Sequence, residues 1–306
     1  MSQIVSEVAE VAEDEDLLDE EDLLDDEEWE EERISRADWG PEYLVAPRFA
    51  WDSPYMAVLA FGSAFVGLFL TSLYSFLLFH SLAEFYSITV AFTVTILAWN
   101  LRIFLSNGFL LFIGVGMAFV AGIDLLHALA YKGMGVFPGY DANLPTQLWI
   151  GGRYLEAGLL LVAVLKPAQR YDENLLFVGF AAITTLFLVS IFGWDIFPDC
   201  YVEGQGQTAF KVISEYVIVG ILGVTLFRLS MIRGTLHDAM FKFLSWAVVT
   251  FILSELLFTF YVGVYDLSNL LGHFLKAVSF YLIYKAVVVT GLAHPFSLVF
   301  RRMPRD

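Results

Sequence analysis

The chain has 306 residues, of which 58 % are hydrophobic and 16 % aromatic, and its mean hydropathy is +0.67. These values exceed what a single soluble core requires, so they exclude an ordinary water-soluble globular protein and indicate a membrane protein. The formal net charge of −17 is concentrated at the N-terminus, because residues 1–38 hold 18 of the 34 acidic residues and only two arginines.

Residues 1–50 contain Leu-Leu pairs and Trp29 scattered among carboxylates. Such a segment cannot bury enough apolar surface to fold alone, and anionic lipid would repel it. It has neither the basic n-region nor the apolar h-region of a signal peptide. We therefore expect residues 1–50 to form a mostly disordered, acidic cytoplasmic tail. Further along the chain, the single Cys200 excludes an intrachain disulfide framework.

Apolar windows of the roughly 20 residues that a bilayer requires of a helix come after the tail. They predict eight spans near residues 56–79, 84–105, 109–131, 148–166, 174–194, 210–230, 239–263 and 268–292. The predicted fold is an all-α integral membrane protein with a polytopic domain over residues 51–299. Residues 300–306 would form a short basic cytoplasmic end with no output domain.

Lysine and arginine in the connections predict the orientation, because they accumulate on the cytoplasmic side. Only Lys132 and Lys211 fall on one side, whereas twelve fall on the other: Arg33, Arg36, Arg48, Arg102, Lys166, Arg170, Arg228, Arg233, Lys242, Arg301, Arg302 and Arg305. The second side is thus expected to be cytoplasmic, with both termini on it.

The ionisable residues inside the predicted spans gather in the outer half of the membrane. His80 would close the first span and Glu84 open the second, so both are expected at the outer rim. The others are Asp124, His127, Arg153, Glu156, Lys211, Glu215, Glu255, His273 and Lys276. Each charge costs a few kcal/mol in a bilayer, so these residues must form pairs, be hydrated or face a shared cavity. Their clustering favours an outward-facing pocket, capped by the aromatic and glycine-rich loops after residues 130 and 191. Ion pairs and interhelical hydrogen bonds that only fix helix packing are the alternative.

Histidine and carboxylate are ligand types for a first-row transition metal. The candidate ligands are His80, His127, His273, Glu84, Asp124 and Glu255. Since no HxxxH or HExxH pair occurs, such a site would have to be assembled across helices. A polar small molecule, a quinone or a lipid headgroup remains an open alternative ligand.

The motifs of common enzymes do not occur in the chain: HExxH, GxSxG, the histidine-rich boxes of membrane oxygenases and GxxxxGK[ST] are absent. We therefore expect no catalytic activity. A retinal-type photoreceptor is an alternative, because Lys276 lies mid-helix in the last span and WIGGRYLEAGLLL (149–161) resembles a segment of microbial rhodopsins. A small-molecule transporter or channel is a second alternative, but the polar layer stops halfway across the membrane.

Several segments carry a resemblance to a known family: IDLLHALAYKGMGVFPGYDANLPTQLWIGGRYLEA (123–157), LFHSLAEF, AWNLRIF, FPDCY, FKVISEY and SELLFTFYVGVYDLSNLLGHFLKAVSFYLIYKA (254–286). The chain resembles the third family of membrane-associated sensor domains, MASE, over about residues 52–298. The resemblance implies an input module that is typically joined at its C-terminus to a histidine kinase or a diguanylate cyclase. Two motif positions of the family in these segments are not among the predicted ligand-binding residues: Asn100 and Gly272.

The sequence thus predicts a multi-pass sensory domain of the cell membrane. It would bind a ligand in an outer-leaflet pocket and signal to a cytoplasmic kinase or cyclase, as in a two-component system, or within a homodimer. We expect no nucleic-acid partner. The predicted ligand-binding residues are His80, Glu84, Asp124, His127, Tyr131, Gln147, Trp149, Arg153, Tyr154, Glu156, Glu215, Glu255, His273 and Lys276.

Overall fold

The computed structural model describes residues 54–102, 108–260 and 266–289. The chain divides into two compact units, residues 1–58 and 59–306, and only the first five residues of one helix are described in the first unit. The predicted acidic tail and the predicted basic C-terminal end lie outside the described residues.

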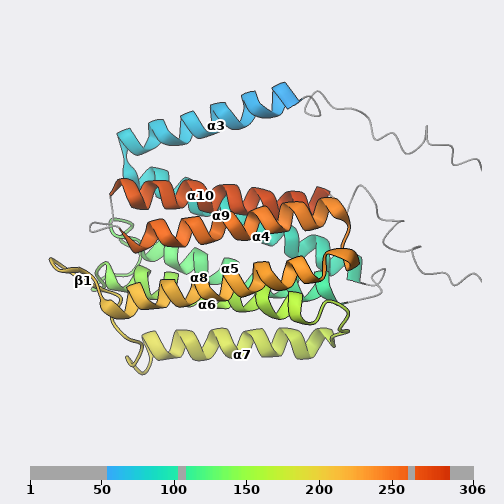
Figure 1. Ribbon diagram of the computed structural model, residues 1–306. Coiled ribbons are helices and arrows are strands. Elements are labelled where there is room, and N and C mark those ends of the chain that lie inside the picture. The colour runs from blue at the N-terminus through green and yellow to red at the C-terminus, as the bar shows by residue number, and fades with distance from the viewer. Residues whose placement is uncertain (1–53, 103–107, 261–265, 290–306) are drawn as a thin grey trace, which may run out of the picture. The chain divides into compact units, whose positions relative to one another are not determined.

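The regular secondary structure of the described residues is helical apart from one small hairpin (Figure 1). Its helices are α3 (Pro54–Tyr74), α4 (Phe76–Leu101), α5 (Phe109–Ala130), α6 (Asn143–Leu165), α7 (Glu173–Phe192), α8 (Ala209–Met231), α9 (Asp238–Thr259) and α10 (Leu267–Tyr284). A 3₁₀ turn (Arg233–Thr235) succeeds α8, and a π-helical turn (Lys285–Val289) continues α10. Strands β1 (Tyr201–Val202) and β2 (Gly206–Gln207) pair antiparallel.

Within the described residues, the seven helices α4 to α10 are long and apolar enough to cross a membrane, and α3 contributes a shorter apolar stretch, Leu59–Tyr74. The prediction of an all-α, multi-span membrane protein is confirmed.

The predicted boundary between the first two spans is wrong. The chain does not continue as one helix to residue 79: α3 ends at Tyr74, and Ser75 caps α4 by accepting a hydrogen bond from the Leu78 amide at 3.3 Å. A single serine inside an apolar run barely changes the mean hydropathy, although its side chain is well suited to start a helix. In consequence His80 and Glu84 lie four residues apart on one face of α4 instead of on two spans.

The start of α6 also differs from the prediction, because the helix begins at Asn143 and not near residue 148. Pro145 lies in its first turn, where a missing amide hydrogen costs no helical hydrogen bond. The later residues of this helix therefore lie about one and a half turns deeper than expected.

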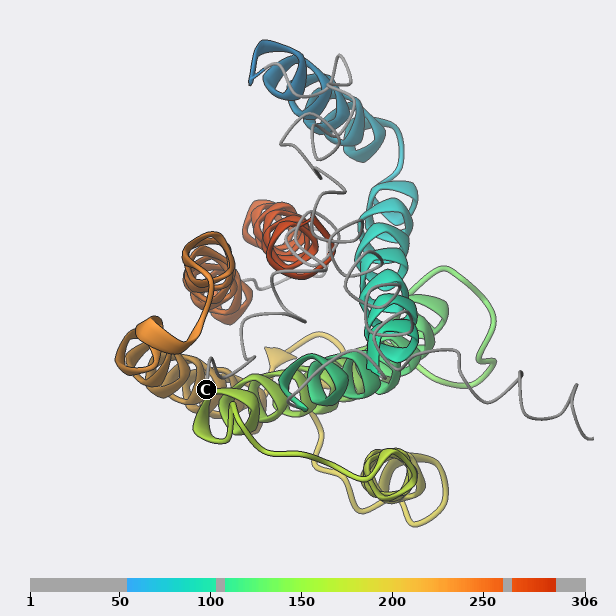
Figure 2. The same ribbon diagram turned by 90° about the vertical axis from the view of Figure 1, so that its right-hand side faces the viewer.

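Six helices form a closed ring, in which each packs against the next in the order α4, α5, α6, α8, α9, α10 and back to α4. Figure 2, which looks along the helices, shows this ring with α7 outside it. α7 packs mainly on α5 and has few buried residues. α3 contacts α10 through two pairs of aromatic side chains, Phe61–Tyr281 and Phe65–Phe274.

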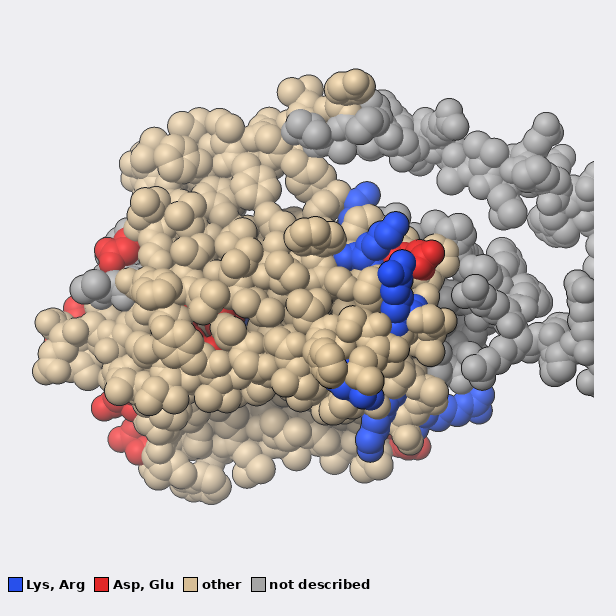
Figure 3. Space-filling model, in the orientation of Figure 1, with Lys and Arg blue, Asp and Glu red and all other residues tan. Residues whose placement is uncertain are grey.

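The two ends of the ring differ in charge. Lysine and arginine side chains gather at one end of the surface in Figure 3. This basic end carries Arg102, Lys166, Arg170, Arg228, Arg233 and Lys242. The opposite end, here called the loop end, carries the long connections 131–142 and 193–208.

Close packing of α4 on α5 depends on a glycine. A Cβ atom built on Gly114 would lie 2.2 Å from Ala98 Cβ, and Thr95 Oγ1 donates a hydrogen bond across this contact to the Gly114 carbonyl at 2.8 Å. Small residues at such crossings let two backbones approach closely inside a membrane.

We expect Gly114→Ala to lower the thermal midpoint of the detergent-solubilised protein, because overpacking of this kind costs about 1–3 kcal/mol. Gly122→Ala is the matched control, since it lies on the same helix and its Cβ would meet nothing within 4 Å. Equal midpoints for the two variants would contradict the close α4–α5 contact.

Candidate ligand-binding site

The interior of the ring holds a layer of polar side chains. Among the described residues it contains eight charged side chains and three histidines, none more than 5 % exposed: His80, Glu84, Asp124, His127, Arg153, Glu156, Lys211, Glu215, Glu255, His273 and Lys276. At 1.5 Å per residue they lie within about 20 Å of the loop end. Glu156 is the deepest, because α6 starts early. Nearer the basic end, no charged side chain of the described residues is buried.

Asp124 of α5 is the centre of an ion-pair network. Its carboxylate accepts hydrogen bonds from Arg153 of α6 at 2.6 and 2.7 Å, and Lys276 Nζ of α10 lies 3.0 Å from Asp124 Oδ2. Lys276 also donates to Glu84 Oε2 of α4 at 2.6 Å, and Arg153 pairs with Glu156 on its own helix. Four helices are thereby linked through charge-assisted hydrogen bonds, which are the strong ones.

Trp149 of α6 supports both cations of this network. The Arg153 guanidinium and Lys276 Nζ each lie 4.7 Å from its ring centroid, so both make cation–π contacts. Phe258 packs edge-on against the same indole at 4.6 Å. The aromatic ring therefore fills space beside two buried charges without adding another charge.

A second cluster, here called the histidine cluster, adjoins the network on the side of the loop end. It consists of His80, Glu84, His127 and His273, each of which offers one ligand atom within 4.8 Å of the others. His80 Nε2 lies 3.3 Å from His127 Nε2, and His273 Nε2 lies 3.3 Å from Glu84 Oε1. The Tyr131 ring stacks on His80 with 3.6 Å between centroids.

A third group joins α8 to α9. Lys211 Nζ lies 2.5 Å from Glu215 Oε1 on the same helix and donates to the Phe258 carbonyl at 2.6 Å. Glu255, one turn before Phe258, is buried near this pair, but its Oε2 atom has no hydrogen-bond partner. The predicted ligand-binding residues do not include Lys211. Its position four residues before Glu215 is visible in the sequence, and this spacing places the two side chains next to each other on one helix face.

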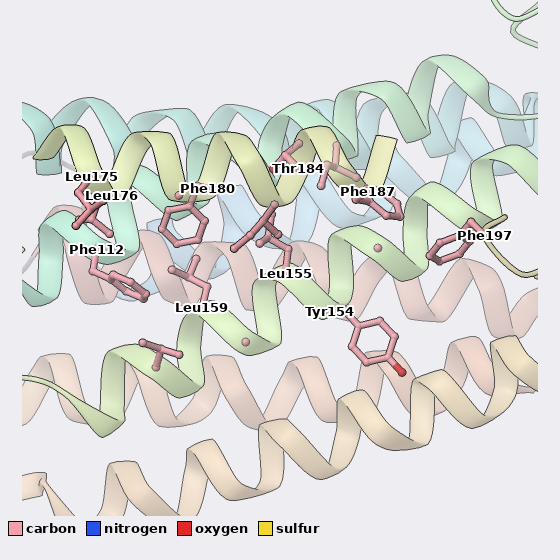
Figure 4. Close-up of a pocket in the computed structure, with 16 residues that line it drawn as sticks. Phe112, Tyr154, Leu155, Leu159, Leu175, Leu176, Phe180, Thr184, Phe187 and Phe197 are labelled. Atoms are coloured by element: carbon pink, nitrogen blue, oxygen red, sulfur yellow. The ribbon is translucent and has the colours of Figure 1, made fainter. Parts of the chain in front are cut away.

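Two cavities differ sharply in size and chemistry. The small one, of about 30 Å³, touches the histidine cluster and is lined by His127, His273, Trp149 and Tyr131 among others. The large one, of about 540 Å³, lies between α5, α6 and α7 (Figure 4) and is lined almost entirely by apolar side chains such as Phe180, Leu159 and Phe187. The polar layer therefore has room for something the size of a water molecule or an ion.

Most of the predicted binding residues come together, but not all. The exceptions are Gln147, whose amide donates to the carbonyls of Phe197 and Pro198, and Tyr154, which lines the large apolar cavity. Asn100, a motif position of the resemblance, bonds to the carbonyl of Ile96 in its own helix. Of the six candidate metal ligands, Asp124 and Glu255 stand apart from the histidine cluster.

The loop from α7 to α8 is hydrogen-bonded to the start of α6. Asn143 Oδ1 accepts hydrogen bonds from the amides of Cys200 and Tyr201 at 2.8 and 3.1 Å, and Asn143 Nδ2 donates to Asp199 at 2.7 Å. Gln147 adds two hydrogen bonds to carbonyls of the same connection. Residues 193–208 thus fold against the start of α6 through defined contacts and are here called the cover.

The fold and the site together define a class of protein: a multi-pass membrane domain with a buried polar centre toward one end. Residues 71–295 match the family model described as a membrane-associated sensor domain, MASE3. The match covers well over half of the chain, so the chain belongs to this family, as the resemblance predicts. The chain is therefore a multi-pass, membrane-embedded sensor domain. No curated protein and no solved structure matches it.

We expect Arg153→Met to destabilise the protein strongly, because it leaves Asp124 and Glu156 without their shared cation. Breaking a buried pair in this way costs about 3–5 kcal/mol. Arg102→Met is the matched control, since Arg102 pairs with Glu173 at the partly exposed basic end, where such a pair contributes at most about 1 kcal/mol. Thermal unfolding in detergent measures both, and a drop no larger than that of the control would contradict the role given to Arg153.

Burial raises the pKa of the Cys200 thiol to about 12, so the reactive thiolate is scarce at neutral pH. We expect slow maleimide labelling of the native protein near neutral pH. Asn143→Ala should accelerate it severalfold, because the amides of Cys200 and Tyr201 lose their acceptor and the cover loosens. Glu203→Cys on the exposed hairpin serves as the fast-labelling control. Fast labelling of the unaltered protein would contradict the folded cover.

Proposed function

We propose that the chain senses a ligand at the buried polar layer and signals to a cytoplasmic protein. The observation that carries this proposal is the convergence of ionisable groups from all six ring helices within about 20 Å of the loop end. A bundle that had only to stay folded could replace such groups by apolar residues at little cost or at a gain. Five carboxyl groups face three lysine or arginine side chains in this layer, which exceeds what mutual pairing needs.

The charge of the two ends supports an orientation. The basic end carries the six lysine and arginine side chains named above and also Lys285 at the end of α10, and such residues accumulate on the cytoplasmic side. The loop end would then face outward, and the polar layer would lie toward the outer side of the membrane. A stimulus would enter from outside, and the signal would leave at the basic end.

Helix α10 is the proposed transmitter. It carries His273 and Lys276 in the polar layer, packs against both α4 and α9, and runs to the basic end. Its last turns continue as a π-helix over Lys285–Val289, a local form that is frequent at functional sites. A ligand that favours one packing of α10 would shift its population and so move the cytoplasmic end.

The proposal includes no catalytic step by this chain. The family resemblance suggests a histidine kinase or a diguanylate cyclase as the cytoplasmic partner, and a homodimer is a further arrangement consistent with such partners. A retinal Schiff base at Lys276 is disfavoured, because Nζ is held by Glu84 and Asp124 and Lys276 does not line the large apolar cavity.

A fusion of the whole chain to a diguanylate cyclase tests the proposal. We expect Lys276→Met to change cyclase output at least about fivefold, because couplings between sites are typically 1–3 kcal/mol. Leu271→Ala, on the exposed side of the same helix, is the control and should leave output unchanged. Cyclase product is measured at matched membrane levels of each fusion. Unchanged output for Lys276→Met would contradict a signalling role of the polar layer.

A further inference from the structure

We propose that His80, Glu84, His127 and His273 bind a divalent first-row transition metal ion through three imidazole nitrogens and one carboxylate oxygen. This inference rests on the proposed function, because it names the ligand of the same site. The four residues come from three helices, α4, α5 and α10, and all four are at least 95 % buried.

The spacing of the ligand atoms fits one shared ion. For a tetrahedral site with bonds of about 2.0–2.1 Å, neighbouring ligand atoms are about 3.3–3.4 Å apart. His80 Nε2 and His127 Nε2 are 3.3 Å apart, and so are His273 Nε2 and Glu84 Oε1. The largest separation within the four is 4.8 Å, which small side-chain rotations could close around an ion.

Two of the histidines are held as metal ligands usually are. A backbone carbonyl can only accept a hydrogen bond, so His127 must donate through Nδ1 to Pro145 at 2.7 Å, and His273 through Nδ1 to Asn269 at 2.8 Å. In the neutral rings the lone pairs are then on Nε2, and both point into the cluster. Metal-ligating histidines typically donate their other nitrogen to a carbonyl or carboxylate in this way.

Without a cation, the cluster leaves polar atoms unsatisfied. Glu84 Oε1 and His273 Nε2 each have no hydrogen-bond partner, although they face each other at 3.3 Å. When the His273 ring carries its proton on Nδ1 alone, as its hydrogen bond to Asn269 requires of that atom, both facing atoms present lone pairs, which repel each other in a low-dielectric interior. A metal ion placed among them would convert this repulsion into two coordinate bonds.

The charge of the layer favours a dication. Its five carboxyl groups outnumber its three lysine and arginine side chains, so the layer contains acidic groups that can balance the charge of a divalent ion, which would otherwise be expensive inside a membrane. Imidazole and carboxylate together suit zinc, iron and their first-row neighbours better than they suit magnesium or calcium, which prefer oxygen ligands alone.

The space beside the histidine cluster also limits the size of the ligand. The adjoining cavity of about 30 Å³ is lined by His127 and His273 and also by the exposed Lys132. Binding pockets for organic molecules measure roughly 300–1,000 Å³. The small cavity therefore admits a water molecule or an ion and is too small for an organic ligand.

The first experiment measures metal in the full-length protein, purified in detergent with a histidine-free tag from cells grown with added manganese, iron, cobalt, nickel, copper and zinc. Elemental analysis should find about one equivalent of a first-row metal per chain. His127→Ala and His273→Gln should each retain less than a tenth of it, whereas His237→Ala, at the exposed start of α9, should retain all of it.

A second measurement guards against variants that fail to fold. Metal-stripped wild-type protein is titrated with Co²⁺, which should produce the visible absorption of a four-coordinate nitrogen-oxygen site, and with Zn²⁺, which should raise its thermal midpoint. Glu84→Gln keeps the shape of the side chain and should weaken Co²⁺ binding at least tenfold. Helical circular dichroism confirms that each variant is folded.

Several outcomes would overturn the proposal: no metal and no response to Co²⁺ or Zn²⁺ in the wild type, or equal metal content in His273→Gln and His237→Ala. If metal is absent while Lys276→Met still changes the output of the cyclase fusion, only the metal assignment fails. If metal binds but neither its removal nor Lys276→Met alters that output, metal binding is supported and the sensing role fails.

Discussion

The pairing of Asp124 with Arg153 and Lys276 is the interaction on which the rest of the structure depends. A charge in the hydrocarbon core must find its partner within the protein, and Asp124 finds two, on α6 and on α10. Lys276 then reaches Glu84 on α4, so the ring closes between its first and last helices, which are the farthest apart along the chain. Because each of these charged groups is buried away from water, removing one leaves its partners buried without an opposite charge, which strongly destabilises the fold.

The same network explains why the two halves of the ring are built differently. Toward the basic end the ring is held by apolar contacts and close backbone approach, as at Gly114 and Ala98, and no described charge is buried. Toward the loop end the packing is specified by polar groups that pair across helices. An apolar interior would serve stability equally well, so the surplus of carboxylates and the unsatisfied atoms of Glu84 and His273 point to a task other than folding.

Sequence alone predicts the features that depend on the cost of burying charge and misses those that depend on packing geometry. The existence of apolar spans and the gathering of ionisable groups toward one end are predictable, because a bilayer penalises each misplaced charge, but the depths of Glu84 and Glu156 are not. Which helices pack against each other cannot be predicted, because the ring places α6 beside α8 and leaves α7 outside, and hydropathy carries no information about that order. His80 and Glu84 are predicted on separate helices, since one serine hardly alters an apolar window. Asp124 and Glu255 have the right chemistry for a metal, but Asp124 is already occupied by two cations and Glu255 lies with Lys211 and Glu215.

Glu84 connects the proposed ligand to the proposed transmitter. One carboxylate oxygen bonds to Lys276 at 2.6 Å, and the other faces His273 in the histidine cluster. A cation in the cluster would draw electron density from this carboxylate and weaken its hold on the lysine. Lys276 would then rely more on Asp124, which Arg153 already engages through both oxygens. Since His273 and Lys276 are three residues apart on α10, attraction at the first and release at the second act on adjacent turns of the same helix. A small ion can thus bias the position of α10 without a large cavity, by redistributing bonds among groups that are already in contact.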